Sequence, residues 1–224
     1  MPTSTTANYA DEGNHHVTLF FPRLACQHCA LRAPVDALDC RNIFVRSSIG
    51  SIHMLHDLPK RVRSRLRLVR AHWKRRRSKA RFIVITGSSA KTTTTSLLTN
   101  ILATTYKVRS QIEANRLENA LEVLNRLDGT EDFVVVETGT GQPGDLKVLM
   151  ELLKPDISIV TMVAVEHYSA FRGIEAVEKE KSEVVRALGR AGIAVLNADD
   201  ARVNAMAEQT SARVVTFGGN GSDY

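Results

Sequence analysis

From residue 81 to the end of the chain, apolar and polar positions alternate between short β-branched runs and segments with a helical period. The runs have apolar residues at consecutive positions, as strands buried on both faces do. This alternation predicts an α/β fold, in which helices flank a mostly parallel sheet and ligands bind at the carboxyl ends of the strands. The expected elements are strand 82–86, helix 92–104, strand 107–112, helix 116–127, strand 132–137, helix 144–153, strand 156–163, helix 174–188, strand 192–197, helix 200–208 and strand 212–217.

The segment 57–80 has a different pattern, which predicts a basic amphipathic helix. Val62, Leu66, Val69 and Trp73 recur at helical spacing and form one apolar stripe. Twelve Lys and Arg residues lie between positions 60 and 81 without an acidic residue, so the net charge of +6 belongs to this segment. The helix could contact nucleic-acid phosphates, lie on an anionic membrane surface, or pack its stripe on the domain that follows. We favour a surface or membrane-proximal arm, because Trp73 alone offers no series of stacking aromatic residues.

Residues 1–56 show no sustained period, which indicates a disordered or weakly ordered leader. Translation starting at Met54 would remove most of it. Cys26-Gln-His-Cys29, with Cys40 and His53, could suggest zinc, but the spacing after the first pair is irregular and free thiols are the alternative. Because no signal peptide or membrane-spanning run is evident, we expect a cytoplasmic protein.

The sequence Thr86-Gly-Ser-Ser-Ala-Lys-Thr-Thr93 joins the first strand of the alternating region to its first helix. A strand, a turn of small residues, Lys-Thr and a helix are typical of a phosphate-binding loop. Lys91 is expected to contact the β- and γ-phosphates of a nucleotide, and Thr92 to offer its hydroxyl to Mg²⁺. Ala90 stands where the general pattern has glycine, which is unfavourable if the backbone angle φ is positive. The alternative is a Ser/Thr-rich turn that caps an ordinary helix.

Three further strand ends carry polar groups. Glu137 ends a buried strand, where a Mg²⁺-binding carboxylate would lie near the phosphate loop. Glu166-His167 follows the strand 156–163, and Lys181 lies on the next helix. Asn197-Ala-Asp-Asp200 follows the strand 192–197. The alternatives are a solvated Glu137, a capping or core His167, a Lys181 that pairs with Glu178 or Glu183 on a helix surface, and an N-cap at Asn197–Asp200.

Taken together, these motifs resemble the central ATPase domain of the Mur ligase family from Phe82 to the end of the chain. The resemblance rests on the order and spacing of Thr86–Thr93, Glu137-Thr-Gly with Pro143-Gly-Asp-Leu146, His167-x-x-x-Phe171, Lys179-Glu-Lys-Ser-Glu183 and Leu196-Asn-Ala-Asp-Asp200. It implies ATP-dependent amide formation in the synthesis of peptidoglycan or a related polymer. A substrate carboxylate would attack the γ-phosphate of ATP to give an acyl phosphate and ADP. The amino group of an amino acid or dipeptide would then displace phosphate.

The resemblance also implies roles for individual residues. Lys91, Lys181 and His167 would be catalytic. Lys181 matches a family lysine that is carbamylated by CO₂; a carbamate offers oxygens to Mg²⁺, whereas an ammonium would repel it. Asn115 matches an asparagine that faces the substrate region. The nucleotide would be held by Gly87, Ser88, Ser89, Ala90, Lys91, Thr92, Thr93 and, near adenine, Asn197. One or two Mg²⁺ ions would be held by Thr92, Glu137, His167 and Lys181.

The chain departs from the family in what surrounds this domain. The segment after Asn115 lacks the second asparagine and the Gly-x-Pro of the family motif, and residues 1–80 do not resemble the family's N-terminal domain. A family C-terminal domain has no counterpart before Tyr224. We therefore expect this chain to bind nucleotide weakly and not to complete ligation alone. The alternatives are a catalytically inactive nucleotide-binding remnant or scaffold, a nucleic-acid-binding protein with a basic arm, and a ligase similar to folylpolyglutamate synthase.

Overall fold

The computed structural model describes residues 5–9, 17–21, 60–112, 117–165, 171–219 and 222–223. The chain divides into two compact units, Met1–His56 and Asp57–Tyr224. In the first unit, β1 (Thr5–Tyr9) pairs with β2 (Val17–Phe21) as an antiparallel ladder. The candidate zinc residues of the sequence, Cys26, Cys29, Cys40 and His53, lie outside the described residues.

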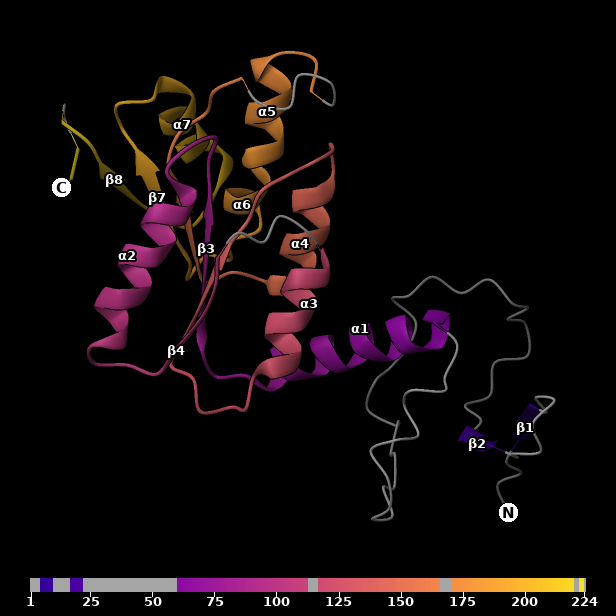
Figure 1. The fold of residues 1–224 in the computed structure, drawn as a ribbon. Coiled ribbons are helices and arrows are strands. Elements are labelled where there is room, and N and C mark those ends of the chain that lie inside the picture. Colours follow the sequence, from indigo (N-terminus) through magenta and orange to yellow (C-terminus); the bar gives the residue numbers. More distant parts are fainter. Residues whose placement is uncertain are drawn as a thin grey trace. The chain divides into compact units, whose positions relative to one another are not determined.

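The second unit contains the predicted alternation of strands and helices (Figure 1). Its elements are α1 (Lys60–Arg77), β3 (Arg81–Thr86), α2 (Lys91–Ala103), β4 (Val108–Gln111), α3 (Leu117–Arg126), β5 (Phe133–Glu137), α4 (Asp145–Leu153), β6 (Ile157–Val160), α5 (Ile174–Lys181), α6 (Glu183–Arg186), β7 (Ile193–Asn197), α7 (Ala201–Ala205), the 3₁₀ helix η4 (Met206–Gln209) and β8 (Arg213–Phe217). Most of the expected boundaries agree with these to within one or two residues.

Three predicted elements differ from the structure. The expected helix 200–208 is α-helical only over α7 and continues as the 3₁₀ helix η4. The expected helix 174–188 is divided into α5 and α6 at Ser182, whose hydroxyl donates to the carbonyl oxygen of Lys179 at 2.7 Å. A serine that bonds to its own backbone competes with the helical pattern. The expected strand 156–163 is paired only as far as Val160, because its neighbour β3 ends at Thr86. Two further backbone bonds continue the contact, from the Thr161 amide to the Thr86 carbonyl at 3.0 Å and from the Ser88 amide to the Met162 carbonyl at 2.9 Å.

A six-stranded sheet with the order β4-β5-β3-β6-β7-β8 forms the centre of the unit. All five neighbouring pairs are parallel, which confirms the predicted α/β class. The chain runs from β3 out to the edge strand β4, returns to β5 and then crosses β3 to reach β6. The carboxyl ends of β3, β5, β6 and β7 therefore share one edge, with β3 at the point where the strand order reverses. This is the place where open α/β sheets bind ligands.

Alternate residues of the strands enter two apolar layers on opposite faces of the sheet. Phe82 and Val84 face the larger layer, which is built with α1, α3, α4, α5, α6 and α7. Ile83 and Ile85 face the smaller layer, where Leu98 and other residues of α2 cover them. Figure 1 shows α2 on the opposite side of β3 from α3 and α4. Because alternate residues of β3 pack into different layers, the strand is fixed from both faces of the sheet. The position of the loop that follows β3 is fixed with it.

The basic helix α1 packs against α3 and α4, but through the face opposite to its predicted apolar stripe. Ala71 is fully buried and Leu68 packs against the larger core. Lys74 Nζ donates to the carbonyl oxygens of Asn125 and Leu127 near the end of α3. Leu66 and Trp73 of the stripe remain 46% and 48% exposed. The interpretation that the stripe itself packs on the domain is therefore wrong.

Arg75 joins α1 to the end of α4. Its guanidinium donates to the carbonyl oxygens of Leu153 and Lys154 and lies 3.9 Å from the ring centroid of Phe82. These carbonyls belong to the last turn of α4, where no intrahelical donor is available. Burial lowers the pKa of Arg75, and Asp156 at 3.6 Å opposes that effect. Arg75 thus caps the end of α4 within the fold.

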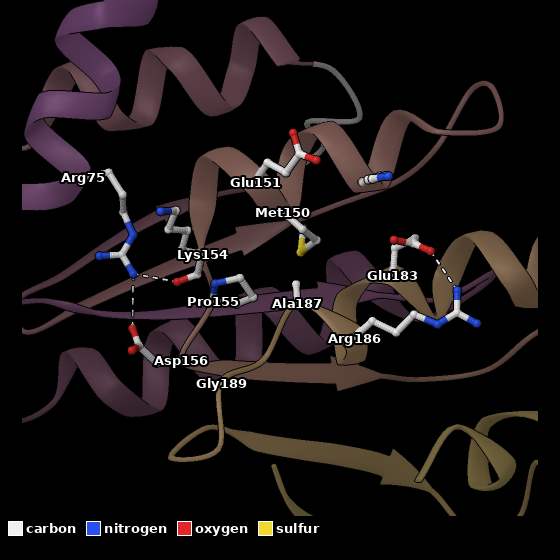
Figure 2. A pocket seen from close by; sticks show the side chains of 11 residues that line it. Arg75, Met150, Glu151, Lys154, Pro155, Asp156, Glu183, Arg186, Ala187 and Gly189 are labelled. Atoms are coloured by element: carbon white, nitrogen blue, oxygen red, sulfur yellow. Dashed lines mark hydrogen bonds and ion pairs between the residues drawn. The ribbon is translucent and has the colours of Figure 1, made fainter. Parts of the chain in front are cut away.

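A pocket of about 600 Å³ lies beside this contact (Figure 2). It is bordered by Arg75, Lys154 and Asp156 on one side and by the Glu183–Arg186 ion pair on the other. Asp156 directly precedes β6, so the pocket lies at the amino ends of the strands, away from the phosphate loop. None of the helices in the described part of the chain has the length and apolar character needed to cross a bilayer.

Candidate active site

The loop between β3 and α2 is tied to the segment that follows β6. A Cβ atom on Gly87 would lie 1.8 Å from Oγ1 of Thr161, so only glycine fits this close approach. The Ser88 hydroxyl donates to the Ala164 carbonyl at 2.9 Å and accepts from the Ala164 amide at 2.8 Å. The Thr161 hydroxyl donates to the Ser89 carbonyl at 2.6 Å. These bonds fix the loop before any ligand binds.

Ala90 occupies the N-cap position of α2 with φ 62° and ψ 5°, which is the left-handed region. This confirms that the position is one where glycine is favoured; a non-glycine residue costs about 1–2 kcal/mol there. No side chain caps the helix, so the interpretation of this turn as an ordinary Ser/Thr cap is wrong. The amide groups of the first turn of α2 remain available to an anion, as in phosphate-binding loops.

Lys91 and Thr92 begin α2 directly after this loop. Lys91 Nζ donates to the Gly87 carbonyl at 2.8 Å, so its ammonium group is folded back over the loop. Thr92 Oγ1 lies 3.1 Å and 3.0 Å from the two carboxylate oxygens of Glu137. Thr93 is exposed in the same helical turn. The structure thus brings a cation, a hydroxyl and a carboxylate together at one edge of the sheet.

Glu137 reaches this position because β5 pairs with β3, with Glu137 opposite Ile85 in the register. Glu137 is only 3% exposed, although its side chain is a carboxylate. A buried carboxylate next to a hydroxyl offers the hard oxygen ligands that Mg²⁺ prefers. Within the described ranges, no three His, Cys, Asp or Glu side chains gather as a metal cluster. The residues present fit Mg²⁺ held by Thr92 and Glu137 and completed by phosphate oxygens.

Glu180 is a structural neighbour of this site that the sequence analysis missed. Its buried carboxylate accepts from the amides of Gly144 at 2.7 Å and Leu146 at 2.8 Å, and from the Thr140 hydroxyl at 3.5 Å. Glu180 therefore holds the loop that follows Glu137 and leads into α4. No pattern in the sequence distinguishes Glu180 from the other acids of α5, since its partners lie some 34–40 positions away.

Lys181 ends α5 and is fully buried. The two acids expected to pair with it on a helix surface bind elsewhere, Glu178 to Arg202 and Glu183 to Arg186, each at 2.8 Å. The surface interpretation of Lys181 is therefore wrong.

Asn197 and Asp200 support the end of β6 from the neighbouring strand. Asn197 Nδ2 donates to the Thr161 carbonyl at 2.8 Å. Asp200 accepts from the Arg202 and Val203 amides, which confirms the predicted N-cap of α7, and its other oxygen accepts from the Val163 amide at 2.7 Å. These bonds orient residues 161–165, from which the chain continues towards His167. His167 and Asn115 lie outside the described residues.

Comparison with known proteins shows the family of this chain. The Mur ligase middle domain matches residues 85–224. The chain belongs to the Mur ligase family. The UDP-N-acetylmuramoyl-tripeptide–D-alanyl-D-alanine ligase of Mycobacterium leprae is 35% identical over 135 residues, which are 59% of this chain and 26% of the relative. The corresponding enzyme of Escherichia coli is 31% identical over 150 residues, which are 64% of this chain and 33% of the relative.

Solved structures of Mur ligases share the fold. The MurF ligase of Thermotoga maritima in complex with ADP superposes with a TM-score of 0.63 at 27% identity, over 71% of this chain and 37% of that one. MurF of Acinetobacter baumannii gives a TM-score of 0.66 at 23% identity, over 70% and 35% of the two chains. This Mur ligase chain therefore spans between about a quarter and two fifths of the length of these relatives.

Proposed function

We propose that this chain is the nucleotide-activating part of an ATP-dependent carboxylate–amine ligase of the Mur type. The observation that carries the proposal is the contact of Thr92 with both oxygens of Glu137, next to Lys91 and the phosphate loop. A hydroxyl and a carboxylate from adjacent strand ends, beside a lysine, form the arrangement that phosphoryl-transfer enzymes use for Mg²⁺ and phosphate.

In this proposal, the loop 87–90 and the first turn of α2 bind the phosphates of ATP through backbone amides. Lys91 turns from the Gly87 carbonyl to the phosphates and neutralises their charge. Asn197, fixed by the Thr161 carbonyl, lies near the base. The preformed loop favours binding, since few groups have to be ordered when the nucleotide arrives.

Thr92 and Glu137 would hold Mg²⁺, with His167 and carbamylated Lys181 holding a second ion. When bound, Mg²⁺ supplies positive charge to the phosphate oxygens. Carbamylation would join the neutral amine of Lys181 to CO₂ with loss of one proton, and would replace a buried cation by an anion. Glu180, on the same turn of α5, keeps the loop after Glu137 in place for this purpose.

The proposed reaction has two steps. An oxygen of the substrate carboxylate forms a bond to the γ-phosphorus and ADP leaves, which gives an acyl phosphate. The amine nitrogen of the second substrate then bonds to the acyl carbon, phosphate leaves, and the nitrogen loses a proton. The protein contributes by positioning the reactants and by neutralising charge.

The names of the relatives suggest the substrates. Those enzymes are UDP-N-acetylmuramoyl-tripeptide–D-alanyl-D-alanine ligases. We propose a muramoyl peptide as the carboxylate substrate and a dipeptide such as D-alanyl-D-alanine as the amine substrate. Peptidoglycan synthesis in the cytoplasm is the corresponding process and location.

Calorimetric titration of the full chain with ATP, with Mg²⁺ or with EDTA, tests the nucleotide site. We expect Lys91→Ala to weaken binding by roughly tenfold or more under both conditions, because it removes a phosphate contact. Glu137→Ala should weaken binding only with Mg²⁺, because it removes a metal ligand. Glu208→Ala, at an exposed acid of η4, is the matched control. The proposed site is wrong if a folded wild-type chain does not bind ATP. It is also wrong if Glu137→Ala weakens ATP binding as much in EDTA as it does with Mg²⁺.

Carbamylation of Lys181 is tested separately by ¹³C NMR in ¹³C-labelled bicarbonate. We expect one carbamate resonance in the wild-type chain and none in Lys181→Gln. Lys179→Gln, which changes the exposed lysine two positions earlier, should keep the resonance. A spectrum without a carbamate signal, or with a signal that survives in Lys181→Gln, would reject this role.

A further inference from the structure

The two sides of α1 have different surroundings. A helix advances by about 100° per residue. Leu68, Ala71 and Arg75 therefore lie within about 60° of one another around the axis, on the side that packs on the domain. Leu66, Val69 and Trp73 lie about 140–160° away from Ala71, on the opposite side. The predicted stripe is thus turned outward by the way in which the helix packs.

The inner side is held firmly. Ala71 is fully buried, Lys74 donates to two carbonyls of the α3 region, and Asn125 Nδ2 of α3 donates to the Arg67 carbonyl at 3.2 Å. Burial and the neighbouring Arg70 lower the pKa of Lys74, which is consistent with an ammonium group inserted between elements. Because these contacts fix the helix, it cannot rotate to bury its outer stripe without losing them.

The outer side combines apolar and cationic groups. Leu66 and Trp73 are 46% and 48% exposed, and Val69 between them is half-buried. Arginines flank this stripe on both sides of the helix. Exposed Arg65 and Arg76 lie on one border, and exposed Arg70 and Arg77 on the other. The Arg77 guanidinium lies 4.7 Å from the Trp73 ring centroid, so charge and aromatic surface are adjacent.

We propose that the outer face of α1, formed by Leu66, Val69, Trp73 and the flanking arginines, binds a membrane surface that contains anionic phospholipids. Interfacial helices place an apolar stripe among the acyl chains, cations at the level of the phosphates, and tryptophan at the boundary. No acid lies between residues 60 and 81 to oppose this attraction. The helix would lie flat on the membrane and hold the nucleotide-binding unit against it.

The apolar stripe favours a membrane over nucleic acid. Phosphate contacts of a nucleic acid would use the arginines but would leave Leu66 and Val69 in water. Trp73 is the one aromatic residue of α1, and single-strand binding uses several stacking side chains. Charge alone fits both partners, and only the lipid surface also buries the stripe.

The fluorescence of Trp73 offers a direct test, because it is the only tryptophan of the chain. We expect vesicles that contain phosphatidylglycerol to shift its emission to shorter wavelength, and phosphatidylcholine vesicles to have no such effect. Binding should weaken as salt is raised, because the lipid charge is screened. Leu66→Glu should reduce vesicle binding by roughly tenfold or more, since a carboxylate replaces a membrane-inserted leucine.

Leu97→Glu is the matched control, since Leu97 of α2 is 58% exposed and the change in charge is the same. It should bind vesicles as the wild-type chain does, and both variants should keep the wild-type melting temperature. An unchanged Trp73 spectrum with anionic vesicles would overturn the proposal. So would equal losses in Leu66→Glu and Leu97→Glu, or tight binding to DNA that Leu66→Glu leaves unchanged.

Discussion

At the scale of single residues, Ala90 shows how a sequence deviation and a backbone angle explain each other. The sequence indicated that glycine is usual at this position, and the structure gives φ 62° there. The strain is tolerated because the loop on one side and α2 on the other fix the backbone, as the Thr94 amide bond to the Ala90 carbonyl at 2.9 Å shows. At position 90, the backbone conformation favours glycine. At position 87, glycine is required because a Cβ atom would overlap with the Thr161 side chain.

We predict that Ala90→Gly stabilises the folded chain by about 0.5–1 kcal/mol. Relief of left-handed strain outweighs the added entropy of glycine in the unfolded chain. Urea unfolding followed by circular dichroism measures the change. Ala103→Gly, at the last residue of α2, should not stabilise the chain. A destabilised Ala90→Gly would show that this position does not need a positive φ in solution.

At the scale of elements, the sequence was most informative where a pattern is local. Strands such as β3 and β5 are continuous apolar runs, so their existence and order follow from composition and spacing. The separation of α5 from α6 at Ser182 was not predicted, and Ser182 itself keeps right-handed helical backbone angles. The role of Glu180 depends on partners that only folding brings near. Thr92 and Glu137 were predicted to meet because parallel strands end at a common edge.

Glu131 offers an element-scale test with a defined pH dependence. Its carboxylate joins the loop before β5 to β4 by accepting from Arg109 Nε at 2.8 Å and from the amides of Asp128 and Gly129. Burial opposes ionisation, but these donors outweigh it and lower the pKa of Glu131 below its ordinary value. The stabilisation is therefore complete above the ordinary pKa of glutamate and is lost as the pH falls through the lowered folded-state pKa.

We predict that Glu131→Gln destabilises the chain by about 1–2 kcal/mol at pH 7 and by less at acidic pH. Urea unfolding at a series of pH values measures this difference. Glu208→Gln, at an exposed position of η4, should change stability little at any pH. A penalty for Glu131→Gln that grows as the pH falls would contradict the assigned role.

At the scale of the whole molecule, α1 is part of the compact unit Asp57–Tyr224, although its composition suggested a surface or membrane-proximal arm. Periodicity located its apolar stripe but could not tell which side meets the core. Here the packing side is built from Ala71, Leu68 and the charged groups of Lys74 and Arg75, which donate to carbonyl oxygens at the ends of α3 and α4. The result is a helix with one side packed on the fold and the other side exposed.

We predict that Ala71→Leu destabilises the whole unit by about 1–3 kcal/mol, because Ala71 is fully buried and a larger side chain has to displace its neighbours. Leu66→Ala, on the outer side of the same helix, should change stability by less than about 0.5 kcal/mol. Urea unfolding of both variants measures the contrast. Equal effects would mean that α1 does not pack on the domain as described.

The central claim is that Thr92 and Glu137, from adjacent strand ends, act together on one magnesium–nucleotide complex. A double-mutant cycle on ATP affinity, with Thr92→Val, Glu137→Gln and the double variant, tests it most directly. With Mg²⁺, the account predicts that the two losses are not additive and that the coupling is about 1 kcal/mol or more. With EDTA the coupling should vanish. Additive losses with Mg²⁺, or a coupling that persists without the metal, would contradict the account.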